Sequence, residues 1–190
     1  MVERIAYTVF ESPWEQLLVA SSRRGLCLVQ FGRSLGRART ELARLWGPAE
    51  WVESPRENAE VLRALGAYVR GDARHFALPL DLRGTPFQLA AWRALLRIPY
   101  GATRSYQELA RAAGRPRAVR AAGMACGSNR VPIIVPCHRV VGSDGSLTGF
   151  SALGGPASRE GGGLRLKQEL LAHECRSKFA MARPKRIHPQ

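Results

Sequence analysis

The chain has 190 residues, of which 45% are apolar and 23% are charged, and this balance excludes a wholly disordered chain or a fibrous repeat. Its length allows one large domain or two small ones. No run approaches the roughly 20 apolar residues that cross a bilayer, and residues 1–10 carry charge where a signal peptide needs an apolar run. We therefore expect a cytoplasmic protein without a membrane partner.

Basic residues outnumber acidic ones, with 29 Lys and Arg against 15 Asp and Glu, and the formal net charge is +14. A charge of this size attracts polyanions, so nucleic acid is the first candidate partner. Two plain alternatives, a solubility device and an arginine-rich genome, stay open until a site supports the first.

The fold class that the sequence indicates is α+β, beginning with a small α/β domain over residues 1–80 that contains an antiparallel sheet. Apolar runs at residues 5–10, 17–20 and 26–31 are separated by turn signals, which is typical of antiparallel strands. Two stretches with apolar side chains at helical spacing follow, at residues 35–46 and 58–69. No catalytic motif is visible in this domain.

A mainly helical second domain is expected over residues 81–175. An N-cap followed by proline predicts a helix over 86–97, and a capping box starts another over 105–113. A third helix is expected over 116–122, after a glycine turn. Two short helices joined in this way favour a helix-turn-helix, although an ordinary helical hairpin fits the spacing equally well.

Beyond these helices, residues 131–135 have the apolar run of a buried strand, which would deliver the chain to Cys137. Residues 142–163 are rich in Gly and Ser and are expected to form a binding loop. Helical spacing returns over 164–174. The basic tail, residues 176–190, has little to bury and is expected to be disordered.

The four cysteines form no C-x-x-C pair, so neither a disulfide framework nor a zinc site is indicated, and no metal is expected: they are Cys27, Cys126, Cys137 and Cys175. Cys27 lies in an apolar run and is expected to be a small buried hydrophobe. The same reading fits Cys137 poorly, because His and Arg follow it and a proline turn precedes it. We expect that thiol to be exposed enough to react.

A free thiol has a pKa of about 8.5, so only roughly 3% is thiolate at pH 7 without help. His138 directly follows Cys137, and Glu174 lies in a helix that could fold back to orient the imidazole. These three residues are therefore a candidate nucleophile, base and orienting acid.

The run Val-Pro-Ile-Ile-Val-Pro-Cys-His-Arg-Val-Val at residues 131–141 is similar, almost residue for residue, to the signature of the methylated-DNA-protein-cysteine methyltransferases, also called O6-alkylguanine-DNA alkyltransferases. The resemblance extends over residues 81–174 and is weaker before them. It implies that Cys137 takes an alkyl group from O6 of guanine, or O4 of thymine, and becomes a thioether, so each molecule acts once. His138 would take the thiol proton through a water, Glu174 would polarise His138, and no cofactor is needed.

The resemblance implies three further roles, each with a plainer alternative. Tyr106 matches the phenol that gives a proton to the leaving base, or it packs as a half-buried aromatic. Asn129 matches a hinge asparagine that ties the DNA-binding helix to the thiol segment, or it is a turn residue. Arg120 matches the arginine that replaces the extruded nucleotide in the base stack, or it is a phosphate contact or a solvated charge.

The family places its helix-turn-helix in the minor groove of double-stranded DNA, where small side chains permit close approach. The residues expected to contact DNA are Arg117, Arg120, Ala121 and Ala122. The expected substrate pocket consists of Pro132, Val140, Phe150 and Ser151. The resemblance implies that the backbone carbonyls of Cys137 and Val140 hold the guanine amine and that the Ser151 N–H donates to O6. We expect the protein to act as a monomer.

The chain departs from the family pattern at Arg130, where proline is frequent, and at Cys126, and neither is expected to touch the thiol chemistry. A glycine-rich insertion at residues 153–162 predicts a wider pocket entrance that accepts alkyl groups larger than methyl.

Two rival functions are a damage sensor that binds alkylated DNA without repair and a cysteine hydrolase. A sensor lacks the acceptor thiol, and a hydrolase turns over many times.

Overall fold

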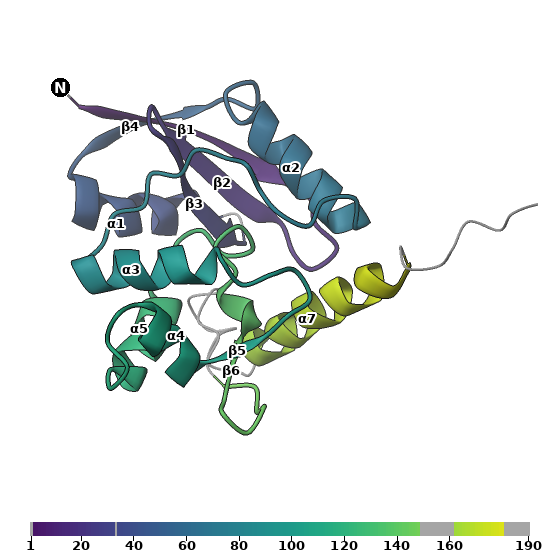
Figure 1. Cartoon of the computed structure of the whole chain (residues 1–190). Coiled ribbons are helices and arrows are strands. Elements are labelled where there is room, and N and C mark those ends of the chain that lie inside the picture. Colours follow the sequence, from purple (N-terminus) through teal and green to yellow (C-terminus); the bar gives the residue numbers. More distant parts are fainter. Residues whose placement is uncertain (1, 33, 149–161, 181–190) are drawn as a thin grey trace, which may run out of the picture.

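The computed structural model describes residues 2–32, 34–148 and 162–180. A sheet with helices on its faces comes first along the chain, and a group of helices that ends in the long helix α7 (Gly162–Ala180) comes second (Figure 1). No helix within these ranges is long and apolar enough to cross a membrane.

The amino-terminal sheet has four strands, β1 (Glu3–Phe10), β2 (Leu17–Ser22), β3 (Gly25–Phe31) and β4 (Ala49–Glu53), in the order β3-β2-β1-β4. β1 pairs antiparallel with β2, and β2 with β3, which confirms the three predicted strands. β4 lies parallel to β1, so the sheet is mixed. β4 was not predicted because none of its side chains is fully buried, which leaves little apolar alternation to recognise.

The two predicted helices of this half are α1 (Leu35–Trp46) and α2 (Ala59–Arg70), and they cover opposite faces of the sheet. Side chains alternate between the faces along a strand. Leu18 therefore packs in the cluster that contains the α1 side chains, whereas Leu17 packs in the cluster that contains those of α2. Cys27 is buried in the α1 cluster, as expected of a small hydrophobe.

Three helices open the second half, α3 (Pro86–Leu95), α4 (Tyr106–Ala112) and α5 (Val119–Gly127), and they pack against one another. The two expected capping boxes are present at the starts of α3 and α4. α4 and α5 form the expected two-helix unit (Figure 1). α5 begins later and runs further than predicted, because packing of its small side chains outweighs the low helix propensity of its glycines.

Residues 131–135, predicted as a buried strand, form consecutive turns instead, with Ile133 in a left-handed conformation at φ 74°. Their side chains are buried as expected. However, Pro132 within the run and Pro136 after it have no N–H group, and a central strand needs those donors. The apolar run therefore predicted the burial of these side chains correctly, whereas the predicted strand is wrong.

The chain then enters a short 3-10 helix, η1 (Cys137–Arg139), which is followed by the two-residue strand β6 (Val140–Val141). β6 pairs in parallel with β5 (Arg104–Ser105), immediately before α4. The thiol segment is thereby fixed to the start of the two-helix unit.

One apolar core runs through both halves of the chain. Tyr68 of α2, Trp92 of α3 and Val135 belong to the same cluster of buried side chains. A backbone hydrogen bond also crosses between the halves, from Val29 N to Arg130 O at 2.8 Å. The sheet therefore supports the segment that leads to Cys137.

The last helix is longer than the predicted 164–174, since α7 continues to Ala180, and the prediction of a disordered tail is wrong for residues 176–180. No Gly or Pro interrupts residues 175–180, so the local sequence contains no signal that would end the helix earlier. Residues 181–190 lie outside the described residues.

We predict that Gly25→Ala lowers the free energy of unfolding by about 2–4 kcal/mol. Gly25 has φ 137°, which other residues rarely adopt, and an added Cβ would collide with the carbonyl of Pro79. Urea denaturation of the two variants checks this. Gly36→Ala in α1 is the matched control, because nothing lies within 4 Å of its added Cβ and alanine favours a helix. Equal midpoints for Gly25→Ala and the parent would contradict the prediction.

Candidate active site

The Cys137 thiol is almost completely enclosed, with 4% of the residue exposed, so the prediction of an exposed thiol is wrong. The flanking Pro136 and His138 are buried as well, because the turns before η1 fold inward rather than form a loop at the surface. The sulfur accepts a hydrogen bond from Asn129 Nδ2 at 3.1 Å.

Asn129 connects the end of α5 to the turns that carry Cys137. Its Nδ2 donates to the carbonyl of Val135 at 2.7 Å as well as to the sulfur. Its Oδ1 accepts from the backbone N–H of Val131 at 3.0 Å. The side chain therefore contacts both ends of the turns at residues 131–135 as well as the Cys137 sulfur, and the expected hinge role stays a prediction.

Burial raises the pKa of the Cys137 thiol. The hydrogen bond from Asn129, the charge of Lys167 and nearby backbone groups oppose this rise without cancelling it. The thiol is therefore protonated at neutral pH, and it needs a base before it can act as a nucleophile.

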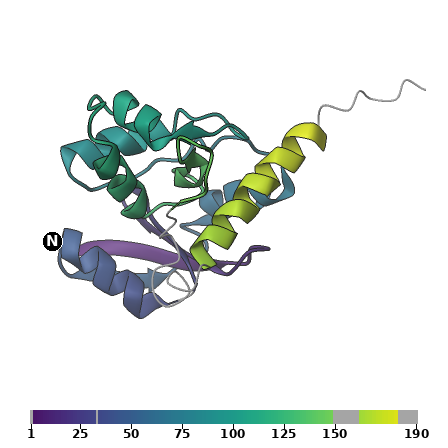
Figure 2. The same cartoon turned by 90° about the horizontal axis from the view of Figure 1, so that it is seen from below.

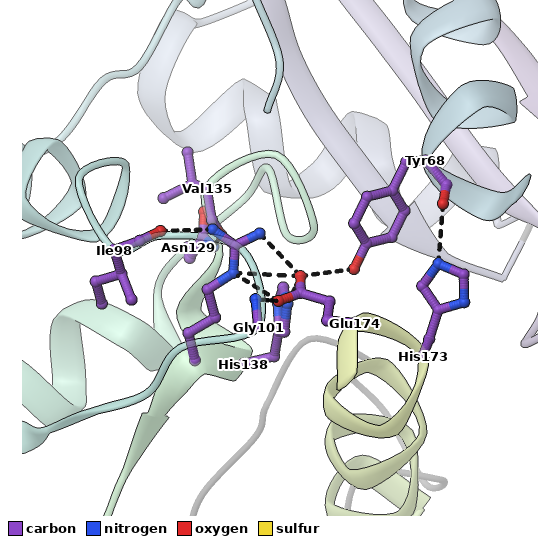
Figure 3. Close-up of polar contacts among 9 residues, drawn as sticks. Tyr68, Ile98, Gly101, Asn129, Val135, His138, His173 and Glu174 are labelled. Carbon is purple, nitrogen blue, oxygen red and sulfur yellow. Dashed lines mark hydrogen bonds and ion pairs between the residues drawn. The ribbon is translucent and has the colours of Figure 1, made fainter. Parts of the chain in front are cut away.

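Glu174, on α7, is a buried carboxylate surrounded by donors from distant parts of the chain (Figure 3). Its Oε1 lies 2.8 Å from His138 Nε2, 2.8 Å from Arg139 Nη2 and 2.9 Å from the hydroxyl of Tyr68. Its Oε2 accepts from Gly101 N at 2.8 Å and from Arg139 Nε at 3.0 Å. His138 and Glu174 thus meet as the sequence suggested, whereas the other three donors were not predicted.

The charges of this group follow from its contacts. Burial acts to raise the pKa of Glu174, but hydrogen bonds from His138 and Arg139 and the positive charge of Arg139 outweigh it and hold the pKa well below its usual range. Burial, together with the charges of Arg139 and Lys167, lowers the pKa of His138 by more than Glu174 raises it, so the ring is uncharged at neutral pH.

The ionised Glu174 can only accept, so the hydrogen between the two side chains belongs to His138 Nε2. Nδ1 then carries the lone pair of the ring. It is buried and has no hydrogen-bond partner in the described part of the chain. His138 Nδ1 is therefore the basic atom of the site.

Tyr106 is half-buried at the start of α4, and its hydroxyl donates to the carbonyl of Thr148 at 2.9 Å. Burial raises the pKa of the phenol, which therefore stays protonated at neutral pH. Both interpretations of Tyr106 are compatible with this position: it packs as a half-buried aromatic, and it lies within electrostatic range of the Cys137 sulfur.

Lys167 was not predicted, although it is fully buried on α7. Its Nζ donates to the carbonyl of Thr148 at 2.8 Å and lies 5.7 Å from the centroid of the Tyr106 ring. Burial lowers the pKa of Lys167, while the nearby thiols raise it. The available signal was a lysine on the apolar face of a predicted helix, two turns before Glu174.

Two further residues correct the sequence-based picture. Cys126 is buried on the inner face of α5, within electrostatic range of Tyr106 and Lys167, so this departure does touch the surroundings of the Cys137 thiol. Burial raises its own pKa, which keeps it protonated. The amino-terminal half, in which no catalytic motif was visible, contributes Tyr68.

The expected DNA-contacting residues divide into two groups. Arg120, in the first turn of α5, and Arg117, in the turn before that helix, are both exposed. Ala121 is half-buried, and Ala122 is completely buried. Ala122 cannot meet DNA as expected, because it lies on the same inner face as Ala125, three residues further along the helix.

Of the expected pocket residues, Pro132 is buried in the turns before Cys137, and Val140 is buried directly after η1. Phe150, Ser151 and residues 153–161 of the insertion lie outside the described residues. In the ranges that the structure covers, no group of three or more His, Cys, Asp or Glu is placed to hold a metal ion.

Two family models match the chain. The 6-O-methylguanine DNA methyltransferase ribonuclease-like domain matches residues 5–82, and the DNA binding domain of the same name matches residues 86–176. The chain therefore belongs to the 6-O-methylguanine DNA methyltransferase family.

Similar proteins agree with this assignment. The chain is 42% identical to a methylated-DNA-protein-cysteine methyltransferase of Methanosarcina barkeri over 168 aligned residues. The alignment covers 88% of this chain and 96% of that protein. It is 51% identical to the enzyme of the same name from Mycolicibacterium paratuberculosis over 126 aligned residues, which cover 66% of this chain and 70% of that protein. The crystal structure of Mycobacterium tuberculosis O6-methylguanine methyltransferase superposes with a TM-score of 0.75 at 38% identity, covering 91% and 94% of the chains. The M. tuberculosis OGT in complex with DNA gives 0.73 at 37% identity, covering 92% and 94%.

We predict that Glu174→Gln lowers the free energy of unfolding by about 3–5 kcal/mol, because Arg139 then remains buried without its counter-charge. Glu169→Gln on the same helix is the matched control. Its ion pair with Arg165 is far more exposed, so its loss should cost less than about 1 kcal/mol. Urea denaturation at neutral pH compares the two variants, and equal losses would contradict the prediction.

The effect of Glu174→Gln should shrink in acid. The pKa of Glu174 is lower in the folded chain than the value of about 4.3 expected after unfolding. The carboxylate therefore contributes its full stability above that pH and loses it as the pH falls through the folded-state pKa. The gap between the unfolding free energies of parent and variant should therefore stay constant at higher pH and narrow steadily as the pH falls below about 5. A gap that widens below that pH would refute the assignment.

Proposed function

We propose that this chain repairs alkylated DNA by moving an alkyl group from O6 of guanine in double-stranded DNA onto Cys137. The observation that carries the proposal is a thiol held by Asn129 beside the buried His138–Glu174 pair. These residues lie in the stretch that matches the family's DNA binding domain. The similar proteins are named for the same reaction, which supports the choice of substrate.

In the proposed step, the Cys137 sulfur attacks the alkyl carbon, a carbon–sulfur bond forms, and the bond from that carbon to guanine O6 breaks. The thiol proton passes through a water to His138 Nδ1. The leaving guanine takes a proton from the Tyr106 hydroxyl, which is later restored from solvent. The thioether has no ready hydrolytic exit, so each molecule acts once, and O4 of thymine is a second substrate of the same chemistry.

The protonation states of the resting site support these roles. His138 is uncharged and can accept a proton, and the ionised Glu174 stabilises the imidazolium that results. Burial keeps the Tyr106 phenol protonated until a developing negative charge demands its proton. The Tyr106 hydroxyl must exchange its present acceptor, the Thr148 carbonyl, for the base.

The alkylated oxygen lies inside a paired duplex, so the nucleotide must leave the stack at a cost of a few kcal/mol. In the proposed complex, α5 enters the minor groove and the exposed Arg120 takes the place of the extruded nucleotide. Arg117 contacts the phosphate backbone, which makes binding weaker at high salt. We expect a monomer that works in the cytoplasm, wherever its DNA lies, without a cofactor.

We predict that duplex DNA carrying a labelled O6-methyl group on guanine transfers the label to Cys137, with one equivalent per molecule. Trypsin cleavage after Arg130 and Arg139 isolates Cys137 from every other cysteine, so peptide mass locates the label. Cys137→Ser should bind the duplex without transfer. Cys175→Ser, at an exposed cysteine, is the control that should transfer fully.

Two outcomes contradict the proposal. A folded protein whose Cys137 stays unmodified by excess substrate is not an alkyl acceptor and would fit a damage sensor. Release of more than one equivalent of alkyl product per molecule would fit a cysteine hydrolase.

We predict that Arg120→Ala slows repair of duplex DNA by about tenfold or more, while its reaction with free O6-benzylguanine changes by less than about twofold. The free base needs no extrusion, so only the duplex reaction depends on this side chain. Arg63→Ala, which removes the same charge from an exposed position on α2, is the control. Equal slowing of Arg120→Ala on both substrates would assign Arg120 to the pocket instead of to extrusion.

A further inference from the structure

The outer face of α5 carries a large apolar side chain that packs against no core cluster. Met124 is 71% exposed, more than any other large hydrophobic residue in the described ranges. The opposite face of the helix is closed by buried residues, Ala122, Ala125 and Cys126. Met124 therefore does not contribute to the packing of the two-helix unit.

Met124 lies on the same face of α5 as Arg120. Residues four positions apart on a helix are neighbours on its surface, and Met124 follows Arg120 by four. Gly127, which is exposed three residues further along the helix, has no side chain, and Gly123 faces the ring of Tyr106. The methionine therefore rises above an otherwise low surface, one turn beyond the arginine.

The charges around this face fit a polyanion. The stretch 106–127, which contains α4 and α5, has exposed arginines and a single acidic residue, Glu108, in the first turn of α4. The exposed arginines of the stretch are Arg111, Arg115, Arg117 and Arg120. An apolar side chain surrounded by this charge suits a DNA groove, where basic residues meet the phosphates and apolar wedges meet sugars and base steps.

We propose that Met124 is a positioning residue for the repair of duplex DNA, an inference that rests on the proposed function. In the bound state its thioether packs against the sugars and base edges beside the gap that Arg120 fills. A methionine suits such an irregular surface because it is unbranched and polarisable. The Met124 side chain thus acts as a wedge: it stabilises the open base step and so favours the extruded nucleotide over the stacked one.

The test compares Met124→Ala with the parent in single-turnover reactions. Alanine favours a helix, so α5 is retained. The duplex rate should fall by about tenfold, as expected when a few methylene-sized contacts are lost. The reaction with free O6-benzylguanine should stay within about twofold of the parent, since the pocket is unchanged.

Two matched variants sharpen the comparison. Met124→Leu keeps an apolar side chain of similar size and should restore most of the duplex rate. Leu45→Ala removes an exposed apolar side chain from α1, far from α5 along the chain, and should leave both rates unchanged.

A second readout does not depend on rates. Peroxide converts an exposed methionine to its sulfoxide, and bound duplex should protect Met124 from this oxidation in Cys137→Ser, which binds without reacting.

Equal duplex rates for Met124→Ala and the parent, or oxidation of Met124 that DNA does not slow, would overturn the wedge. Equal slowing of Met124→Ala on duplex and free base would also overturn it, by assigning the residue to the pocket. Each of these results leaves label transfer to Cys137 in the parent intact, so the wedge can fail while the proposed function stands.

Discussion

An ionised carboxylate taken out of water is costly unless donors surround it. At Glu174 those donors come from α2, from the turn before β5 and from η1, so the charge is stable only when these segments and α7 are all in place. Figure 2 shows α7 lying along the side of the molecule, where it meets both halves of the chain. The same carboxylate determines which nitrogen of His138 carries the hydrogen. One buried charge thus ties the assembly of the fold to the protonation state of the site.

The acceptor thiol is subject to opposing effects. Burial keeps Cys137 protonated, which lowers its reactivity, while Asn129 and Lys167 stabilise the thiolate once a base has removed the proton. For a side chain that the proposed reaction consumes once, this balance is favourable. Electrophiles in solution meet an enclosed thiol, whereas in the proposed reaction the substrate is bound where His138 can take the thiol proton.

Much of the fold could be predicted where local chemistry decides it. Capping residues located the starts of α3 and α4, and alternating apolar runs located β1 to β3. The run at 131–135 was misjudged because an apolar stretch indicates burial without distinguishing a strand from buried turns. Cys137 and His138 were singled out by the run at 131–141, and Glu174 by a predicted helix that could fold back toward them; the contact between His138 and Glu174 confirms this last expectation. Lys167 and Tyr68 belong to no motif, and their roles depend on contacts between segments far apart in the sequence, which local patterns do not encode.

The position of Glu174 on α7 makes the site depend on a segment that follows its other members in the sequence. During translation the segments that carry Tyr68, Gly101 and His138 leave the ribosome before α7 does. Until that helix docks, the imidazole has no carboxylate to orient it, and Arg139 has no buried counter-ion. The nascent polypeptide therefore carries Cys137 and His138 before Glu174 is available, and the buried group around this carboxylate is complete only after α7 has been synthesised and has docked.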